Sequence, residues 1–123
     1  MKLVLVYMTA KDTKEARRLA KTLVTEKIVA CANILDGMNS LYFWEGRLCD
    51  DREAVLIAKT RATLLPKLVR RVRQLHSYSV PCIAAMPITG GNTAFLDWVS
   101  KETRPGQAPS APRRPGRSVK SAG

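Results

Sequence analysis

A single histidine and three cysteines are the side chains of this 123-residue chain best suited to bind a soft or borderline metal ion. His76 follows a segment with helical periodicity, and a neutral imidazole is a common ligand of copper and zinc. Cys31, Cys49 and Cys82 are odd in number and never form a C-x-x-C pair, which favours reduced thiols over a disulfide framework or a zinc knuckle. One histidine alone cannot make a metal site, and a helix end also favours a donating side chain, so both roles stay open for His76.

Carboxylates gather between residues 45 and 53, where Asp50 and Asp51 are adjacent and Glu45 and Glu53 flank them. Such a cluster suits a hard or borderline cation. The more common role is that of a solvated hairpin tip, and Arg52 dilutes the negative charge. We therefore expect residues 49–51 to form an exposed turn.

Patterns typical of enzymes are missing from the sequence. The only glycine-rich loop, ITGGN at 88–92, precedes a helix start, where anions bind well, but it matches neither nucleotide-binding fingerprint. The sequence also has no nucleophile–base pair and no zinc-ligand spacing. We therefore expect a protein that is not an enzyme.

The net charge of +11 is concentrated in part at one end of the chain. Residues 104–123 hold five basic residues and no acidic one, and they are dominated by Pro, Gly, Ser and Ala. This composition predicts a disordered basic tail after a folded domain at 1–103. The folded part keeps 16 basic and 10 acidic residues, a balance of +6. With no RNA-recognition motif, we expect no specific nucleic-acid partner.

The apolar segments are short. None approaches the roughly 18 residues that a membrane span requires, and the run of about five near the N-terminus precedes no cleavage site. We therefore expect no membrane association and a cytoplasmic location.

The hydrophobic pattern alternates between strand and helix periods. Asp12, with Glu15 three residues on, is typical of a helix start. The predicted elements are strands at 2–9, 29–36, 40–48 and 53–60, a strand within 76–88, and helices at about 12–27, at about 63–75 and from Asn92 onward. This order predicts an α+β, ferredoxin-like fold, β-α-β-β-α-β, with a long central hairpin and a short C-terminal helix.

The segment SLYFWEG places four large apolar residues in a row, so this strand is apolar on both faces. Two helices cover only one face of a small sheet. Tyr42 and Trp44 therefore need a second cover, and another copy of the chain is the most economical one.

Five segments together, TEKIVACANI, SLYFWEG, LIAKT, LHSYSVPCIAAMPITGGN and FLDWV, resemble the CutA family of divalent-cation tolerance proteins. The resemblance extends from about Lys2 to Thr103. It implies a ferredoxin-like protomer, a homotrimer around a three-fold axis, and association with copper or other divalent cations, in a cytoplasmic protein without established catalytic activity.

The resemblance also implies site residues. Some family members have proposed copper ligands, a cysteine and a His-His pair, at positions held here by Met8 and by Leu75-His76. With Cys31 in the family's cysteine position, the candidate ligands are Met8, Cys31 and His76, a set that favours Cu(I). Copper is not expected to be required for folding. Ser77 stands where the family often has Pro, and Ser79 where it often has Glu.

The interface of the implied trimer is expected to include aromatic side chains. The residues are Tyr42, Trp44, Glu45, Tyr78 and Trp98. An alternative function is a trimeric signalling module similar to the PII proteins, which would bind a small anionic ligand between subunits.

We predict that residues 104–123 are dispensable for folding and assembly, because they offer no apolar periodicity and contain four of the chain's seven prolines. Removing them should lower the net charge by five per chain and leave the melting temperature nearly unchanged. Differential scanning calorimetry of both forms makes the comparison. A drop of many degrees would show that the tail packs on the domain.

Overall fold

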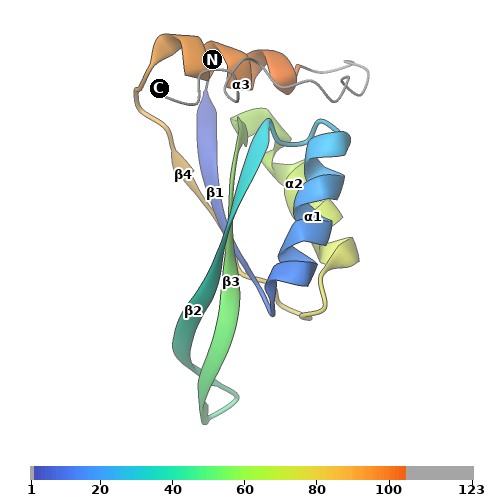
Figure 1. Cartoon of the computed structure of the whole chain (residues 1–123), viewed down its shortest axis with the longest axis vertical. Helices are drawn as coiled ribbons and strands as arrows, with labels where there is room; N and C mark the ends of the chain where they lie inside the picture. Colours follow the sequence, from blue (N-terminus) through green and yellow to red (C-terminus); the bar gives the residue numbers. More distant parts are fainter. Residues whose placement is uncertain (1, 105–123) are drawn as a thin grey trace.

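A computed structural model describes residues 2–104 (Figure 1). Four strands form one antiparallel sheet in the order β2-β3-β1-β4, the arrangement of a ferredoxin-like fold. The expected α+β fold is confirmed. The predicted tail lies, apart from Arg104, outside the described residues. The elements are β1 (Leu3–Ala10), α1 (Thr13–Thr25), β2 (Cys31–Trp44), β3 (Arg47–Arg61), the 3₁₀ turn η1 (Ala62–Leu64), α2 (Leu65–Leu75), β4 (Ile83–Pro87) and α3 (Thr93–Glu102).

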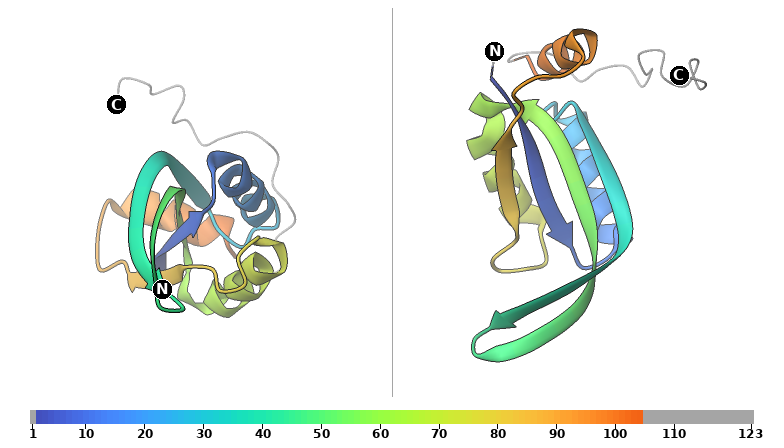
Figure 2. Two further views of the ribbon diagram at one scale, coloured as in Figure 1. Left: turned by 90° about the horizontal axis from the view of Figure 1, so that it is seen from below. Right: turned by 90° about the vertical axis from the view of Figure 1, so that its left-hand side faces the viewer.

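Helices α1 and α2 lie side by side on one face of the sheet (Figure 2). Side chains of a strand alternate between faces, and directly paired residues share a face. On β1, Val6 and Met8 point toward the helices, as do their partners Ala58 and Leu56 on β3. The helices contribute the other half of the core, which includes Ala16, Leu19, Leu23, Leu68 and Val72. All of these side chains are buried.

Asp12 caps α1, as the sequence predicts, by accepting a 2.8 Å hydrogen bond from the backbone N–H of Glu15. At the other end of this helix, Lys27 forms a 2.6 Å ion pair with Glu102 of α3. Together with Leu3, Ala30 and Val99, which form a small separate core, this pair holds α3 across one end of the sheet.

The long central hairpin differs from the expectation in its turn. The strands expected at 29–36 and 40–48 are one strand, β2, and the chain reverses at Glu45-Gly46 rather than at residues 49–51. Both turn residues have positive φ, 51° and 78°, as a two-residue type I′ turn requires. This turn matches the twist of the flanking strands, so Asp50 and Asp51 remain in β3, paired with Leu41 and Ser40.

A β-bulge interrupts β2 halfway along the hairpin. Leu35 pairs with Val55 and Met38 with Glu53, so β2 has one residue more than β3 between these pairs. Gly37 takes φ +79° at the bulge, in the left-handed region that glycine tolerates best. The extra residue reverses the alternation of β2. After the bulge, Tyr42 and Trp44 lie on the face of the sheet opposite the helices.

The distal half of the hairpin extends past the ends of both helices (Figure 1). Beyond the bulge its two faces are both exposed, including Leu41 and Phe43 on one side and Trp44 on the other. Within residues 2–104, no helix has the length and apolar character needed to cross a membrane.

Candidate functional site

A groove of about 770 Å³ lies on the sheet face opposite the helices, between the hairpin and the loop that precedes β4. The hairpin supplies one wall and the segment 78–82 the other, while β1 forms the floor. Its lining includes Tyr7, Met38, Tyr42, Trp44, Glu53 and Tyr78. The bulge in β2 creates this wall, because it turns the aromatic side chains of the distal hairpin toward β1.

Two tyrosines that line the groove each donate a hydrogen bond to a carboxylate of β3. Tyr42 donates a 2.5 Å hydrogen bond to Asp51, and Tyr78 donates a 2.7 Å hydrogen bond to Glu53. The bond to Asp51 raises the pKa of Tyr42 to about 12. Burial, followed by the bond to Glu53, raises the pKa of Tyr78. Both phenols therefore stay protonated at neutral pH and act as donors, and Glu53 adds an acidic, hydrogen-bonding group to the aromatic lining of the groove.

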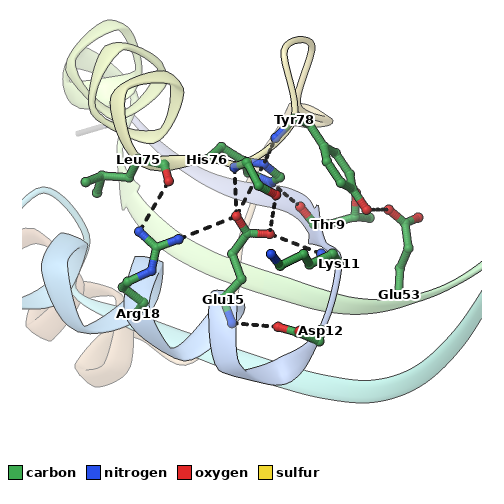
Figure 3. Close-up of polar contacts among 10 residues, drawn as sticks. Thr9, Lys11, Asp12, Glu15, Arg18, Glu53, Leu75, His76 and Tyr78 are labelled. Carbon is green, nitrogen blue, oxygen red and sulfur yellow. Dashed lines mark hydrogen bonds and ion pairs between the residues drawn. The ribbon is translucent and has the colours of Figure 1, made fainter.

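His76 fixes the position of Tyr78 (Figure 3). The imidazole Nε2 lies 2.8 Å from the carbonyl oxygen of Thr9, which can only accept, so Nε2 carries the proton. Nδ1 then accepts a 3.0 Å hydrogen bond from the backbone N–H of Tyr78. The two rings also pack together with centroids 4.7 Å apart. Both ring nitrogens are therefore engaged within the protomer.

A buried carboxylate, that of Glu15, holds the loop from the other side (Figure 3). Its side chain is 1% exposed and accepts hydrogen bonds from the backbone N–H groups of Lys11 and Ser77 and from the Ser77 hydroxyl. Arg18 lies 3.5 Å away and His76 Nδ1 3.8 Å away. A proline at position 77 could make neither Ser77 bond, so this loop is anchored through its own serine.

The environment of Glu15 has opposing effects on its pKa. Burial raises the pKa, but the hydrogen bonds from Ser77 and Lys11 outweigh this effect, so the pKa lies below its ordinary value of 4.5. The ionised carboxylate is thus the form that the fold stabilises. A continuous polar network joins the start of α1, through His76 and Tyr78, to Glu53 in the groove.

The three candidate metal ligands do not converge within the protomer. His76 lies close to the backbone next to Met8, because its imidazole bonds to the carbonyl oxygen of Thr9. The Met8 side chain, however, is fully buried in the core beneath the helices. Cys31 pairs with Lys59, whose other partner is Leu5, so it lies on the opposite sheet face from Met8. Residues 2–104 contain no group of three or more His, Cys, Asp or Glu side chains arranged to hold a metal ion.

The remaining cysteines have structural surroundings that differ from the expectation. Cys82 directly precedes β4, where alternation with Ile83 predicts a core position, but the structure places it exposed at the rim of the groove. Partial burial and the nearby Glu53 raise the pKa of its thiol. Cys49, expected to be exposed, is half-buried in β3 opposite Tyr42. A raised pKa keeps the Cys82 thiol protonated and weakly nucleophilic.

The five predicted interface residues occupy three places. Tyr42, Trp44 and Tyr78 meet in the groove. Glu45 lies at the tip of the hairpin in the turn. Trp98 is on α3 at the other end of the sheet, where it packs against Phe95 with ring centroids 5.9 Å apart. The structure therefore brings together only the first three within one protomer.

The glycine-rich loop before α3 is capped by its own side chain. Asn92 accepts a 3.1 Å hydrogen bond from the backbone N–H of Ala94, which occupies a donor that an anion would use.

Sequence reasoning missed the roles of Glu15 and Thr9 in this site, and it named Glu53 only as one member of an acidic cluster. The capping pattern at Asp12 did single out Glu15, but only as part of a helix start. No local pattern shows that its carboxylate reaches residue 77, because the contact spans 62 positions.

The fold and groove define a ferredoxin-like α+β protein with an aromatic and acidic groove on its uncovered sheet face. Residues 4–102 match the family described as CutA1 divalent ion tolerance protein, and the chain belongs to this family.

Related proteins support this assignment. The divalent-cation tolerance protein CutA of Thermus thermophilus is 44% identical over 98 residues, which cover 80% of this chain and 95% of that protein. The chloroplastic protein CutA 1 of Oryza sativa is 43% identical over 82% of this chain but only 57% of its own length. This chain thus spans little more than half of the plant relative.

Solved structures have the same fold. The crystal structure of CutA1 from Oryza sativa matches with a TM-score of 0.83 at 41% identity, covering 85% of this chain and 96% of that one. The CutA structure from Archaeoglobus fulgidus matches with a TM-score of 0.80 at 37% identity, covering 83% and 99%.

The expected cytoplasmic location is wrong. The relatives from Oryza sativa and Arabidopsis thaliana are named chloroplastic, and the Archaeoglobus fulgidus structure is described as that of a periplasmic protein. The physical reason is that a ferredoxin-like domain without a membrane-length apolar run has no property that ties it to one compartment.

We predict that Glu15 makes the stability of this protein sensitive to acid. Because its folded pKa lies below 4.5, its contribution to the free energy of unfolding is present above that pH and is lost as the pH falls through the folded value. Glu15→Gln should cost about 1–3 kcal/mol at pH 7, since the amide cannot accept all of these bonds. The difference from the native protein should shrink below pH 4.

Urea denaturation from pH 3 to pH 8, at one protein concentration, measures this. Glu26→Gln is the matched control, because Glu26 also has a pKa lowered by its partner Arg71 but lies at the exposed surface, where screening weakens the pair. Equal pH profiles for the two variants would contradict the assigned role of Glu15.

Proposed function

We propose that this chain functions as a homotrimer in divalent-cation tolerance, with the distal hairpin of each copy packed against the uncovered sheet face of a neighbour. One observation carries the assembly: the distal hairpin is apolar on both faces and exposed on both. The exposed fractions are 69% for Leu41, 73% for Phe43, 65% for Leu48 and 48% for Trp44. Patches of this kind are typical of protein interfaces.

A second copy fits this surface better than an unrelated partner. The groove offers aromatic side chains and a concave sheet face, and the hairpin that projects beyond the helices offers a long apolar strand pair from the same chain. A self-complementary surface of this kind is satisfied by identical copies. The number three is the expectation that the family resemblance carries.

The groove also supplies the chemistry for cations. Asp51 and Glu53 are two residues apart on β3 and point to the same side, and each accepts a hydrogen bond from a tyrosine that lines the groove. Oxygen ligands of this type suit hard divalent cations. A site with two carboxylates remains open to further ligands from water or from a neighbouring copy, and we expect weak binding.

Copper binding by Met8, Cys31 and His76 has less support from the geometry. The residues present do not fit a common ion, because Met8 is buried in the core, Cys31 lies on the opposite face, and both nitrogens of His76 are engaged. We therefore do not propose a copper site at these residues, and Cu⁺ serves only as a comparison ion in the binding experiment below.

We further propose that the groove binds rather than catalyses. Its phenols and the Cys82 thiol are held in their protonated forms, so no nucleophile is activated there. Its carboxylates also disfavour an anionic ligand, and no observation favours the alternative of a PII-like anion site.

Trp44→Ala should weaken the assembly, because it removes a large side chain that the trimer would bury, at a cost on the order of 3–5 kcal/mol per site. Light scattering at micromolar concentration should give a trimer for the native chain and smaller species for the variant. Val24→Ala is the control, since Val24 is exposed on α1, away from the hairpin. A native monomer would refute the assembly.

Asp51→Asn/Glu53→Gln should remove weak cation binding, with a dissociation constant on the order of 10⁻⁴–10⁻³ M in the native protein. Calorimetric titration with Mn²⁺, Cu⁺ and Zn²⁺ measures it, and Asp36→Asn is the control for loss of an exposed carboxylate. Chelators should leave the melting temperature unchanged. Unaltered Mn²⁺ binding by the double variant would exclude the groove, and loss of Cu⁺ binding in His76→Ala would instead favour the histidine site.

A further inference from the structure

The outer surface of the two-helix layer is strongly basic. Helices α1 and α2 bury their apolar sides in the core, and the residues left exposed on their outer side are mainly Lys and Arg. The exposed basic residues on and just before these helices are Lys11, Lys14, Arg17, Arg18, Lys21, Lys67, Arg70 and Arg73.

Most of these charges have no acidic partner. On the same layer, Glu15 is buried and Glu26 is paired with Arg71 at 2.8 Å, while Asp12 is the helix cap. Arg18 is also engaged, with Glu15 and with the Leu75 carbonyl. Seven of the exposed basic residues form no ion pair within the part of the chain that the structure describes. They are Lys11, which precedes α1, and six residues on the helices: Lys14, Arg17, Lys21, Lys67, Arg70 and Arg73.

The spacing of these six charges suits a polyanion. Lys14, Arg17 and Lys21 follow the i, i+3, i+7 spacing of a single helix stripe and span about 10 Å along α1. The other three charges, Lys67, Arg70 and Arg73, span about 9 Å along the neighbouring helix α2. Six positive charges over about 10 Å match the charge density of a nucleic-acid duplex, which carries one phosphate per about 1.7 Å of axis.

We propose that this helix layer binds the phosphate backbone of duplex nucleic acid without reading its sequence. Contacts to phosphates need only Lys and Arg side chains held on a rigid surface. Here Arg18 of α1 bonds to the carbonyl of Leu75 at the end of α2, and Arg71 of α2 pairs with Glu26 at the end of α1, so the two helices are held together. The sequence expectation of no specific nucleic-acid partner is compatible with binding of this kind.

Two other polyanionic partners fit less well. A membrane-surface helix needs an apolar side free to enter the lipid, but the apolar sides of α1 and α2 are buried, and Val24 is the one large exposed aliphatic residue on either helix. A single-stranded nucleic acid is bound by stacking its bases on aromatic side chains, and α1 and α2 contain no aromatic residue.

Figure 2 shows the helix layer on one side of the sheet, and the residues that line the groove lie on the other, so the helix layer is compatible with the proposed assembly. The inference does not depend on that assembly. If copies associate through the uncovered sheet face, several helix layers face outward, and their linkage strengthens binding to a long duplex.

The test is fluorescence anisotropy of the full chain with a mixed-sequence DNA duplex of 20 base pairs, between 50 and 200 mM salt. Lys14→Gln/Arg17→Gln/Lys21→Gln removes three of the six charges. Its affinity should fall at least about tenfold at 50 mM salt, and the log–log salt slope should decrease in magnitude by two to three, about 0.9 per lost phosphate contact. Circular dichroism confirms that each variant folds.

Matched controls separate this surface from net charge. Lys2→Gln/Lys101→Gln/Arg104→Gln removes the same charge from exposed positions near α3 and should change the affinity less than threefold. Arg113→Gln/Arg114→Gln/Arg117→Gln does the same in the C-terminal segment. Equal losses in the helix variant and either control would overturn the proposal.

The choice of partner is tested with the native chain. Two unrelated duplex sequences should bind within about twofold of each other, and single-stranded DNA should bind more weakly. Stronger binding to single strands, or to vesicles of phosphatidylserine and phosphatidylcholine than to duplex DNA, would overturn the assignment to duplex nucleic acid. The same conclusion follows if no duplex binding is measured at 50 mM salt.

Discussion

The organisation of this protein follows from one constraint: the sheet has two faces, and the helices within residues 2–104 cover only one of them. Burying an apolar sheet face is the main favourable term in forming such a domain. Helices α1 and α2 do so for Val6, Met8, Leu56 and their neighbours. The second face and the distal hairpin keep their apolar side chains exposed, and the groove forms there.

The uncovered face is shaped by polar contacts that begin on the covered side. Glu15, at the start of α1, holds Ser77, and His76 joins Thr9 of β1 to the backbone of Tyr78. Tyr78 then reaches Glu53 across the groove. A buried carboxylate is stable only when such bonds replace its hydration. The helix layer and the groove are therefore connected, although they lie on different faces of the sheet.

The sequence was sufficient to predict the fold but only part of the site. The alternation of Val4, Val6 and Met8 and the helical stripe through Leu19 and Leu23 are local patterns, and both elements are present. The turn was misplaced because Asp50-Asp51 has a turn-like composition, whereas Glu45-Gly46 needs a left-handed glutamate that composition does not reveal.

The rest of the site could not be predicted from the sequence, because it depends on contacts between segments that are far apart in the chain. Met8 and Cys31 both lie on predicted strands, but the face to which each points depends on pairing through β3. His76 was a candidate ligand because of its residue type, and the two hydrogen bonds that engage its ring nitrogens come from Thr9 and Tyr78. Such pairings are properties of the assembled sheet rather than of any local segment.

The bulge at Gly37 has a consequence for how this hairpin can change in length. One extra residue in β2 decides which face Tyr42 and Trp44 occupy. Losing or gaining a single residue between Leu35 and Trp44 would exchange the aromatic side chains of the groove with Leu41 and Phe43. A change of two residues would instead leave each side chain on its present face. The parity of the residue count in this part of β2 therefore matters more to the groove than the length itself.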